Sequence, residues 1–344
     1  MVEITIALDA MGGDHGCSVV VPAALKICKD WQNVRMILVG DQTQITQMLG
    51  QHHALDNECI SIHHASEVVA MNEPPGQALR FKKDSSMRVA INLVKEGVAQ
   101  ACVSAGNTGA LMATAKFVLK TLPGIDRPAI SALWPTMQPN TYVRVLDLGA
   151  NVDSSPEQLF EFAVMGSVLA SAVSNIKNPR VGLLNIGSEE IKGNEQVKAT
   201  AKLLENNPVI NYIGFIEGDG VYRGLADVIV CDGFVGNIAL KTSEGVAKLV
   251  RHYIKTEFEQ NWLTRIAGFS VMPILRRLGK QLNPNRYNGA SLVGLRGTVI
   301  KSHGGTDIFG FVNAINEAIA EVQNDVPAQI SSEVEQILQQ RQQA

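Results

Sequence analysis

The feature that most constrains the fold is a short apolar run followed by a glycine-rich loop and a helix start, a unit that recurs along the chain. In the clearest copy, the apolar run 101–104 leads into the loop 105–109, and helical periodicity begins at Ala110. This alternation predicts an α/β fold with three layers, a mostly parallel, Rossmann-like sheet covered by helices on both faces. The other copies lie at 9–16, 147–153, 185–195, 232–237 and 302–307.

These loops are predicted to gather around an anion. Strand-to-helix loops of a parallel sheet all leave its carboxyl edge, so we expect their polar residues to converge on one cleft. The first N–H groups of a helix lack an internal partner and lie at the positive end of its dipole, and glycine lets the backbone approach a ligand. A single such junction more often only caps a helix, and the repetition favours binding. The substrate-binding candidates are Gly12, Gly13, Asp14, Gly106, Asn107, Thr108, Asn151, Gly187, Ser188, Gly193 and His303.

Lys192 is the one conspicuous cation among these loops, in the segment 188–194 between a strand end and a helix start. A lysine in this place suits a phosphate ligand or a developing oxyanion. The alternative is a solvated lysine paired with Glu189 or Glu190. Lys192 is therefore the first catalytic candidate.

Three further residues are catalytic candidates. Asn237 follows a very short loop at a helix start, where it serves either the site or only as a cap. Asp232 could orient Lys192 or a histidine. His15 and the substrate-binding candidate His303 lie among glycines, where a general acid or base fits, although a lone loop histidine is more often a surface residue. The cysteines at the strand ends, Cys102 and Cys231, are expected to be small buried hydrophobic residues.

The composition and the absence of several known motifs limit the classes of function that the sequence favours. With 46% hydrophobic and 18% charged residues, the 344-residue chain is an ordinary globular protein. Its five cysteines form no metal-binding spacing, so we expect reduced thiols, a cytosolic protein, no metal and no cofactor. The N-terminus carries no basic leader, and the longest uncharged helical run, 162–176, is shorter than the roughly 20 residues needed to span a bilayer. No dinucleotide, Walker, zinc-protease or serine-hydrolase motif occurs, and no nucleic-acid partner is expected.

The segment 238–285 differs from the rest of the chain and is predicted to form two long projecting helices. Trp262, Phe269 and Leu275 are apolar and have arginines on either side, as in helices that lie in a membrane interface. A dimer or core helix would show the same pattern, and the sequence favours neither. Residues 248–301 carry ten Lys or Arg against two Glu, which indicates an anionic partner.

Five blocks of sequence, at 9–14, 104–110, 146–153, 184–193 and 231–237, resemble the signature blocks of the bacterial phosphate acyltransferases of phospholipid synthesis, the acyl-acyl-carrier-protein:phosphate transacylases. The resemblance extends from the first strand to the loop at 302–304. It implies a fold like those of phosphotransacetylases and isocitrate dehydrogenases, with one catalytic domain over residues 1–344. It also implies a homodimer that associates peripherally with the inner face of the cell membrane, next to the downstream glycerol-3-phosphate acyltransferase.

The reaction implied by the resemblance is fatty acyl carrier protein plus inorganic phosphate giving acyl phosphate plus free carrier protein. Thioester and acyl phosphate are both activated, so no ATP is needed if phosphate is held and oriented. The loops of Asn107 and Lys192 could hold it, and Lys192 and Asn237 could stabilise the oxyanion. Two alternatives remain from the residues themselves: a short-chain phosphotransacetylase acting on acetyl-CoA, and a non-enzymatic lipid-phosphate-binding protein. The basic segment could receive an acidic carrier protein, the membrane, or both.

Overall fold

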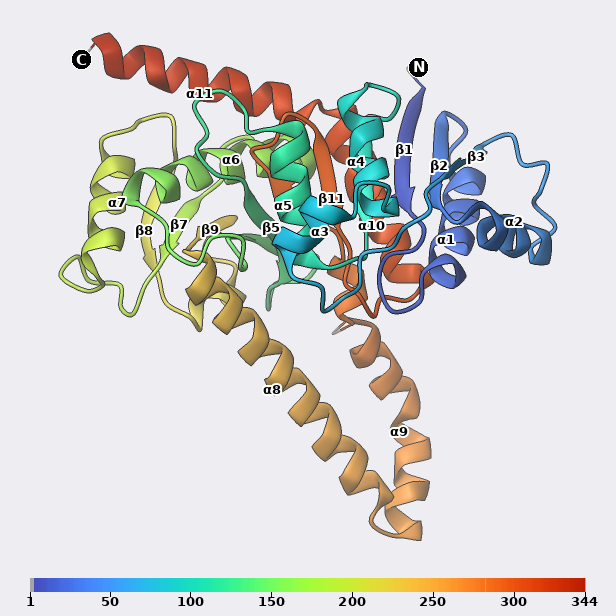
Figure 1. Ribbon diagram of the computed structural model, residues 1–344. Helices are drawn as coiled ribbons and strands as arrows, with labels where there is room; N and C mark the ends of the chain where they lie inside the picture. The colour runs from blue at the N-terminus through green and yellow to red at the C-terminus, as the bar shows by residue number, and fades with distance from the viewer. Residues whose placement is uncertain (1–2, 282, 344) are drawn as a thin grey trace.

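One mixed sheet of eleven strands runs through the part of the chain that the computed structural model describes, residues 3–281 and 283–343 (Figure 1). The strand order is β3-β2-β1-β4-β11-β10-β5-β6-β9-β7-β8. The strands are β1 Ile4–Asp9, β2 Val34–Gly40, β3 Ile60–His64, β4 Ala101–Ser104, β5 Ala129–Pro135, β6 Tyr142–Leu146, β7 Val181–Leu184, β8 Tyr212–Ile216, β9 Val228–Val230, β10 Ala290–Val293 and β11 Thr298–Lys301.

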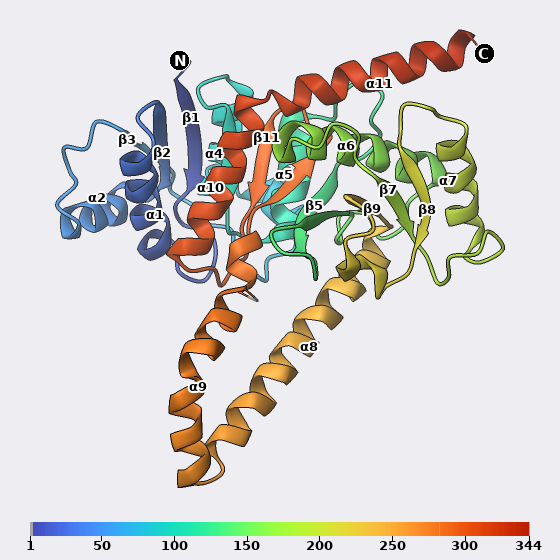
Figure 2. The same ribbon diagram turned by 180° about the vertical axis from the view of Figure 1, so that it is seen from behind.

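Helices cover both faces of this sheet, as Figures 1 and 2 show from opposite sides. They are α1 Cys17–Asp30, α2 Gln42–Gln51, α3 Pro75–Phe81, α4 Ser86–Lys95, α5 Thr108–Leu119, α6 Pro156–Ser174, α7 Glu195–Glu205, α8 Gly233–Glu259, α9 Trp262–Gln281, α10 Ile308–Gln323 and α11 Val326–Gln343, with short 3-10 turns at Gly220–Arg223 and Pro284–Tyr287. The predicted α/β fold class, a mostly parallel sheet between helical layers, is confirmed.

The sheet consists of two parallel blocks joined by antiparallel strands. The first block is β3-β2-β1-β4-β11 and the second is β6-β9-β7-β8. Between them, β10 pairs antiparallel with β11 and β5, and β5 pairs antiparallel with β6. Because three antiparallel pairings reverse the strand direction, the expectation of one shared carboxyl edge is wrong. Two separate sets of loops must meet for a single site to form.

Alternation along the strands builds a core on each face of each block. On β1, Ile6 and Leu8 pack in the cluster that contains residues of α1 and α10, whereas Ala7 packs with α4 and α5. On β9, Val228 and Val230 pack with α6, whereas Ile229 belongs to the cluster on the opposite face. This is the period-2 pattern of a strand buried on both faces.

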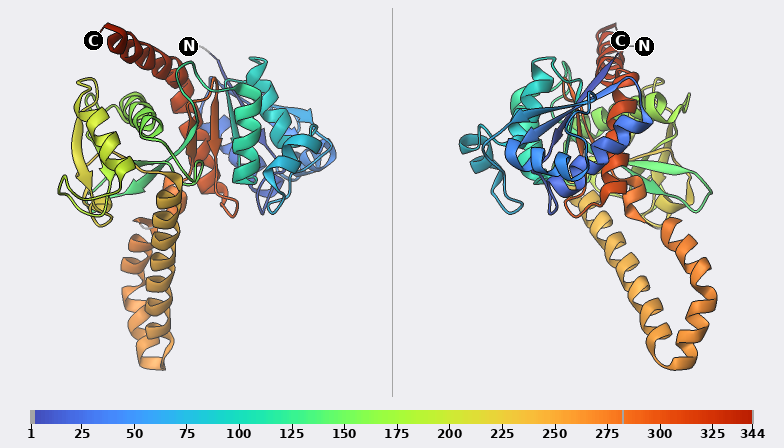
Figure 3. Two further views of the ribbon diagram at one scale, coloured as in Figure 1. Left: turned by 60° about the vertical axis from the view of Figure 1, so that its left-hand side comes forward. Right: turned by 90° about the vertical axis from the view of Figure 1, so that its right-hand side faces the viewer.

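The helices α8 and α9 form a hairpin that leaves the body of the molecule (Figures 1 and 3). Neither Gly245 nor Pro273 interrupts these helices. Trp262 and Phe269, two of the predicted membrane residues, are 68% and 80% exposed, whereas Leu275 is half-buried. Further exposed apolar side chains on the hairpin are Val246, Leu249, Val250, Tyr253, Leu263, Ile266 and Ile274. Within the described residues, no helix has the length and apolar character needed to cross a bilayer.

One local expectation is wrong. The prediction of five reduced cysteines fails because Cys28 and Cys59 form a disulfide, with Cα atoms 5.9 Å apart. They are 31 positions apart in sequence, and packing brings the end of α1 beside the start of β3.

Candidate functional site

Three loops that follow β1, β4 and β11 interlock, and we call them the first loop cluster (residues 9–16, 105–109 and 302–306). The Asp14 amide donates to the Gly304 carbonyl at 2.9 Å. A side chain on Gly13, which has φ +82°, would lie 2.8 Å from the same oxygen, and one on Gly12 would lie 2.8 Å from the Gly106 nitrogen. Both positions therefore need glycine, because the backbones approach too closely for a Cβ atom.

Asp9, the last residue of β1, is the buried centre of this cluster. Its carboxylate accepts hydrogen bonds from the hydroxyls of Ser86 and Ser104, each at 2.6 Å, and Ser104 in turn accepts from the Gly106 amide. Burial raises the pKa of Asp9, and the serine hydrogen bonds oppose that shift. Sequence reasoning gave Asp9 no role. The available signal was an acidic residue that ends an otherwise apolar strand.

The side chain of Asn107 is used to hold the loop in place. Its carboxamide oxygen caps α5 by accepting from the Ala110 amide at 3.0 Å. Its NH2 group donates to the carbonyls of Met71 at 2.9 Å and Glu73 at 3.0 Å. The loop therefore offers a ligand the exposed start of α5 at Thr108 and its backbone N–H groups, because first-turn amides have no acceptor inside a helix.

A second set of loops, which we call the second loop cluster (147–155, 187–193 and 231–237), follows β6, β7 and β9. Here Asp147 is the buried carboxylate, and its two oxygens accept from the amides of Gly149, Ala150 and Asn151. The Asn151 side chain donates to Asp147 at 2.8 Å and to the Pro128 carbonyl at 2.9 Å. The predicted substrate-binding residue Asn151 is thus buried, with its NH2 group occupied by protein acceptors.

The first turn of α8 lies directly against this loop. Asp232 caps the helix by accepting from the Val235 amide at 2.8 Å, and among the described contacts it does not reach Lys192 or a histidine. The structure gives Asp232 a capping role, and the orienting role stays a prediction. A side chain on Gly236 would collide with the Asp147 carbonyl. Asn237 is exposed, within 3.5 Å of the position that a Cβ atom on Gly149 would take.

Lys192 lies in a turn that is fixed by its backbone and leaves the ammonium free. Its amide donates to the Glu189 carbonyl at 2.9 Å, and the Asn185 side chain donates to the carbonyls of Gly187 and Lys192, each at 3.2 Å. Gly193 has φ +95°, and Ser188 and Lys192 are exposed. Across residues 3–281 and 283–343, no ion pair joins Lys192 to Glu189 or Glu190, so the alternative of a paired surface lysine does not describe this turn.

Two observations indicate that the two loop clusters lie near each other. Met112, in the second turn of α5, packs against a hydrophobic cluster that contains Leu148 and is also contacted by Leu240 of α8. His303 lies within electrostatic reach of α8: burial and the Lys301 ammonium lower its pKa, while Glu244 raises it. The described contacts do not join Lys192 directly to the first loop cluster.

Lys301, the last residue of β11, is a second residue that sequence reasoning did not single out. It is 8% exposed, and its ammonium donates to the carbonyls of Ala105, at 3.4 Å, and Ser302. Burial lowers its pKa to about 8, and the negative charges of Asp9 and Asp14 oppose this. A lysine that precedes a Ser-His-Gly-Gly loop gives no sequence signal of burial.

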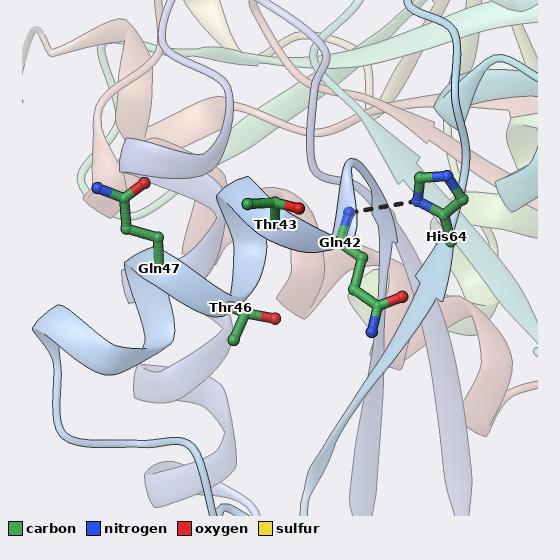
Figure 4. A pocket seen from close by; sticks show the side chains of 5 residues that line it. All are labelled: Gln42, Thr43, Thr46, Gln47 and His64. Carbon is green, nitrogen blue, oxygen red and sulfur yellow. Dashed lines mark hydrogen bonds between the residues drawn. The ribbon is translucent and has the colours of Figure 1, made fainter.

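Two cavities lie near the first loop cluster. One, of about 370 Å³, is lined by His15, Ser18, Val19, Asp307, Ile308 and Phe309, so exposed His15 faces a partly apolar space. The other, of about 570 Å³, lies at the start of α2 beside His64 (Figure 4), where the His64 Nδ1 atom accepts from the Gln42 amide at 3.3 Å. No predicted site residue lines the larger cavity, so we place the site at the loop clusters, where the glycines and amides are.

The described residues support neither a cysteine nucleophile nor a metal site. Burial raises the pKa of Cys102 and of Cys231, so neither thiol is poised to form a nucleophilic thiolate. Within the ranges that the structure covers, no group of three His, Cys, Asp or Glu side chains could hold a metal ion.

Comparison with known proteins agrees with the resemblance in the sequence blocks. A family model described as "Fatty acid synthesis protein" matches residues 4–329. A phosphate acyltransferase from Nitrosococcus oceani is 59% identical over 333 residues, which are 97% of each chain. A phosphate acyltransferase from Legionella pneumophila is 57% identical over 340 residues, which are 99% of each chain.

Solved structures with the same fold are more distant. A phosphotransacetylase from Streptococcus pyogenes superposes with a TM-score of 0.64 at 18% identity and covers 93% of this chain and 94% of that one. The EutD phosphotransacetylase from Staphylococcus aureus gives 0.60 at 19% identity, with the same coverage. At these identities the likeness shows the fold alone, which confirms the expected phosphotransacetylase-like architecture. Since the family model and the phosphate acyltransferases from Nitrosococcus oceani and Legionella pneumophila each match nearly the whole sequence, the chain belongs to the phosphate acyltransferase family.

Proposed function

We propose that this protein transfers a fatty acyl group from acyl carrier protein to inorganic phosphate, which yields acyl phosphate and free carrier protein. A phosphate oxygen attacks the thioester carbon, and the C–S bond breaks. The observation that carries the proposal is the interlocking of three glycine loops around the start of α5, together with a free ammonium group at Lys192. Backbone amides and a lysine are the groups that bind a phosphate dianion.

Separate groups of residues have separate roles in the proposed reaction. The first loop cluster binds phosphate through the backbone N–H groups at the start of α5, at Thr108, while Gly12, Gly13 and Gly106 let the loops approach each other closely. Lys192 and Asn237, both exposed, stabilise the tetrahedral oxyanion. The carrier thiol has an ordinary pKa near 8.5 and leaves as thiolate, so the step needs no strong general acid. His15, in reach of the partly apolar cavity, lies where the thioester could enter.

The projecting hairpin has a different role in the proposal. We assign the body and the hairpin to one catalytic domain, with segment 238–285 as its contact with other surfaces. Its exposed Trp262 and Phe269 and its basic side chains match an anionic membrane surface, and the basic residues also match an acidic carrier protein. In this arrangement a homodimer of the protein works in the cytoplasm at the inner face of the membrane and passes acyl phosphate to a glycerol-3-phosphate acyltransferase.

The reaction is tested by mixing acylated carrier protein with the enzyme and measuring phosphate-dependent release of free carrier. Lys192→Ala should lower the rate about 100-fold or more while the melting temperature stays unchanged, because the side chain is exposed and the oxyanion loses a donor. The matched control is Lys198→Ala, which removes a lysine of α7 that pairs with Glu195. Near-normal turnover in Lys192→Ala would remove Lys192 from the mechanism.

A second candidate function is short-chain phosphotransacetylase activity, which the fold of the distant solved structures favours. The two candidates are distinguished by comparing the long-chain carrier thioester with acetyl-CoA as donor. Faster turnover of acetyl-CoA would replace the leading proposal. Tight phosphate binding without turnover of either donor would instead point to a lipid-phosphate-binding protein.

Membrane contact through the hairpin is tested with vesicles that contain an anionic phospholipid. Phe269→Glu should reduce sedimentation with the vesicles several-fold, because a carboxylate replaces the side chain expected to enter the interface. The control Leu55→Glu changes an exposed apolar residue of the body, 60% exposed, and should leave vesicle binding intact. Unchanged vesicle binding with a change in oligomeric state would make the hairpin a dimer element.

A further inference from the structure

The buried lysine at the end of β11 has no role in the reaction as described so far. Lys301 is 8% exposed, and lysine is almost never buried this deeply without a partner. Among the ion pairs of the described residues none involves Lys301, so its charge is balanced only at longer range by Asp9 and Asp14. A charge held in this way costs stability, which makes its position informative.

The ammonium of Lys301 lies where the three loops of the first cluster meet. It donates to the carbonyl oxygens of Ala105 and Ser302, which belong to two different loops. The third loop joins them because Gly13 packs on Ala105 and the Asp14 amide donates to Gly304. One side chain beneath the loops therefore contacts or adjoins all three.

Both sides of the two contacted peptide groups are fixed. In the Ala105–Gly106 peptide the oxygen accepts from Lys301, and the nitrogen donates to the Ser104 hydroxyl at 3.0 Å. In the Ser302–His303 peptide the oxygen again accepts from Lys301, and the nitrogen donates to the Asn288 side chain at 2.9 Å. These peptides cannot rotate without breaking a bond on each side, so the loops are ordered before a ligand arrives.

We propose that Lys301 is a positioning residue for phosphate: it locks the Ala105 and Ser302 peptides and places a positive charge beneath the loops that hold the phosphate dianion. The inference rests on the proposed function for its choice of ligand. Because it is buried, Lys301 is not expected to touch the reacting atoms. Its effect should fall on phosphate binding and leave the use of the acyl carrier unchanged.

The experiment measures initial rates against phosphate and against acylated carrier for Lys301→Met and Lys301→Arg. The methionine variant keeps the shape without the charge, and we expect the KM for phosphate to rise about tenfold or more. The KM for acyl carrier should stay within about twofold. The arginine variant keeps a charge and should recover part of the phosphate affinity.

The control is Arg144→Met, which removes another buried cation, 2.9 Å from Glu317 and outside both loop clusters. Arg144→Met should melt at lower temperature, because Glu317 loses its partner, but only Lys301→Met should lose affinity for phosphate. A wild-type phosphate KM in Lys301→Met would overturn the proposal and make Lys301 purely structural.

A binding measurement separates this inference from the proposed reaction. Stabilisation of the wild-type enzyme by inorganic phosphate, seen as a rise in melting temperature, should be reduced in Lys301→Met even if no turnover is found. If Lys301→Met does not fold, the wild type and Lys301→Arg suffice. Phosphate affinity of the wild type should fall as the pH rises past about 8, where Lys301 loses its proton, relative to Lys301→Arg, which stays charged. Asp9, Asp14 and His303 face the ammonium and are unchanged in that pair. The same pH dependence in both proteins would overturn the proposal.

Discussion

Asp9 and Asp147 are two buried carboxylates at strand ends, and they organise their loops in opposite ways. The hydroxyl donors to Asp9 come from other elements, Ser86 of α4 and Ser104 of β4. The three shorter amide bonds to Asp147 come from residues that follow it within four positions, and a longer one, at 3.5 Å, comes from Ile130 of β5. The first loop cluster is thus assembled by long-range contacts, whereas the loop after β6 is shaped largely by its own residues.

This difference predicts that the two clusters respond differently when the buried carboxylate is replaced by a carboxamide. A serine hydroxyl can reverse, donating in one orientation and accepting in another. A backbone N–H group can only donate, and its direction is fixed by the chain. Both oxygens of Asp147 therefore face rigid donors. At Asp9 one oxygen accepts from the Met11 amide at 3.3 Å as well as from Ser86, but the other accepts from the adaptable hydroxyl of Ser104.

The largest expected effect is that of Asp147→Asn. One Asp147 oxygen accepts from Gly149 and Ala150, and the other accepts from the amide and side chain of Asn151. Either orientation of the new carboxamide points its NH2 group at two donors, which should lower the free energy of unfolding by about 2–4 kcal/mol. Urea unfolding measures this.

The control is Asp41→Asn at the cap of α2, where asparagine caps as well as aspartate and stability should hardly change. A loss below about 1 kcal/mol in Asp147→Asn would contradict the idea that rigid donors define the loop after β6.

A smaller loss, about 1 kcal/mol, is expected for Asp9→Asn. The NH2 group can face Ser104, whose hydroxyl reverses to accept it while still accepting from the Gly106 amide. The same urea titration compares the two variants directly. A loss equal to that of Asp147→Asn would mean that the serines are as rigid as backbone amides, and the comparison would fail.

The smallest effect is a pH dependence that the two sites should share. Burial is the leading cause that raises the pKa of both carboxyl groups above 3.8. A raised pKa means that the folded protein binds the proton more tightly than the unfolded chain. The resulting stability is complete below the pKa of the unfolded chain and is lost as the pH rises through the pKa of the folded state.

Asparagine removes this contribution, so each substitution should destabilise the protein more in mildly acidic buffer than at neutral pH. Free energies of unfolding of the wild type and both variants, measured at the two pH values, give the sign. An opposite sign at either site would show that hydrogen bonding, rather than burial, dominates its pKa.

Sequence reasoning succeeded where the signal is local. The order of strand, glycine loop and helix can be read from consecutive residues, and α5 begins at Thr108, close to the expected start at Ala110. It failed where partners are distant. The antiparallel insertion of β10 between β11 and β5 and the Cys28–Cys59 disulfide depend on tertiary packing that no short pattern encodes.

The candidate site shows the same division. The glycines in the sequence identified the loops of the candidate site, but the sequence did not predict the roles of individual side chains. Asn107 and Asn151 were expected to bind substrate, and their side chains instead hydrogen-bond protein groups. Lys301 gave no signal because its burial depends in part on the loop of Ala105, which is 196 positions away in sequence.

Helix α8 begins at Gly233 beside the Asp147 loop and continues without a break to Glu259. At 1.5 Å per residue its 27 residues form a rod about 40 Å long. The distance from Asn237 to the far end of this rod is therefore fixed by a continuous helix and not by a flexible linker. A surface that binds the far end of α8 therefore sets the distance between that surface and the loop of Asn237. It also sets the direction in which this loop faces.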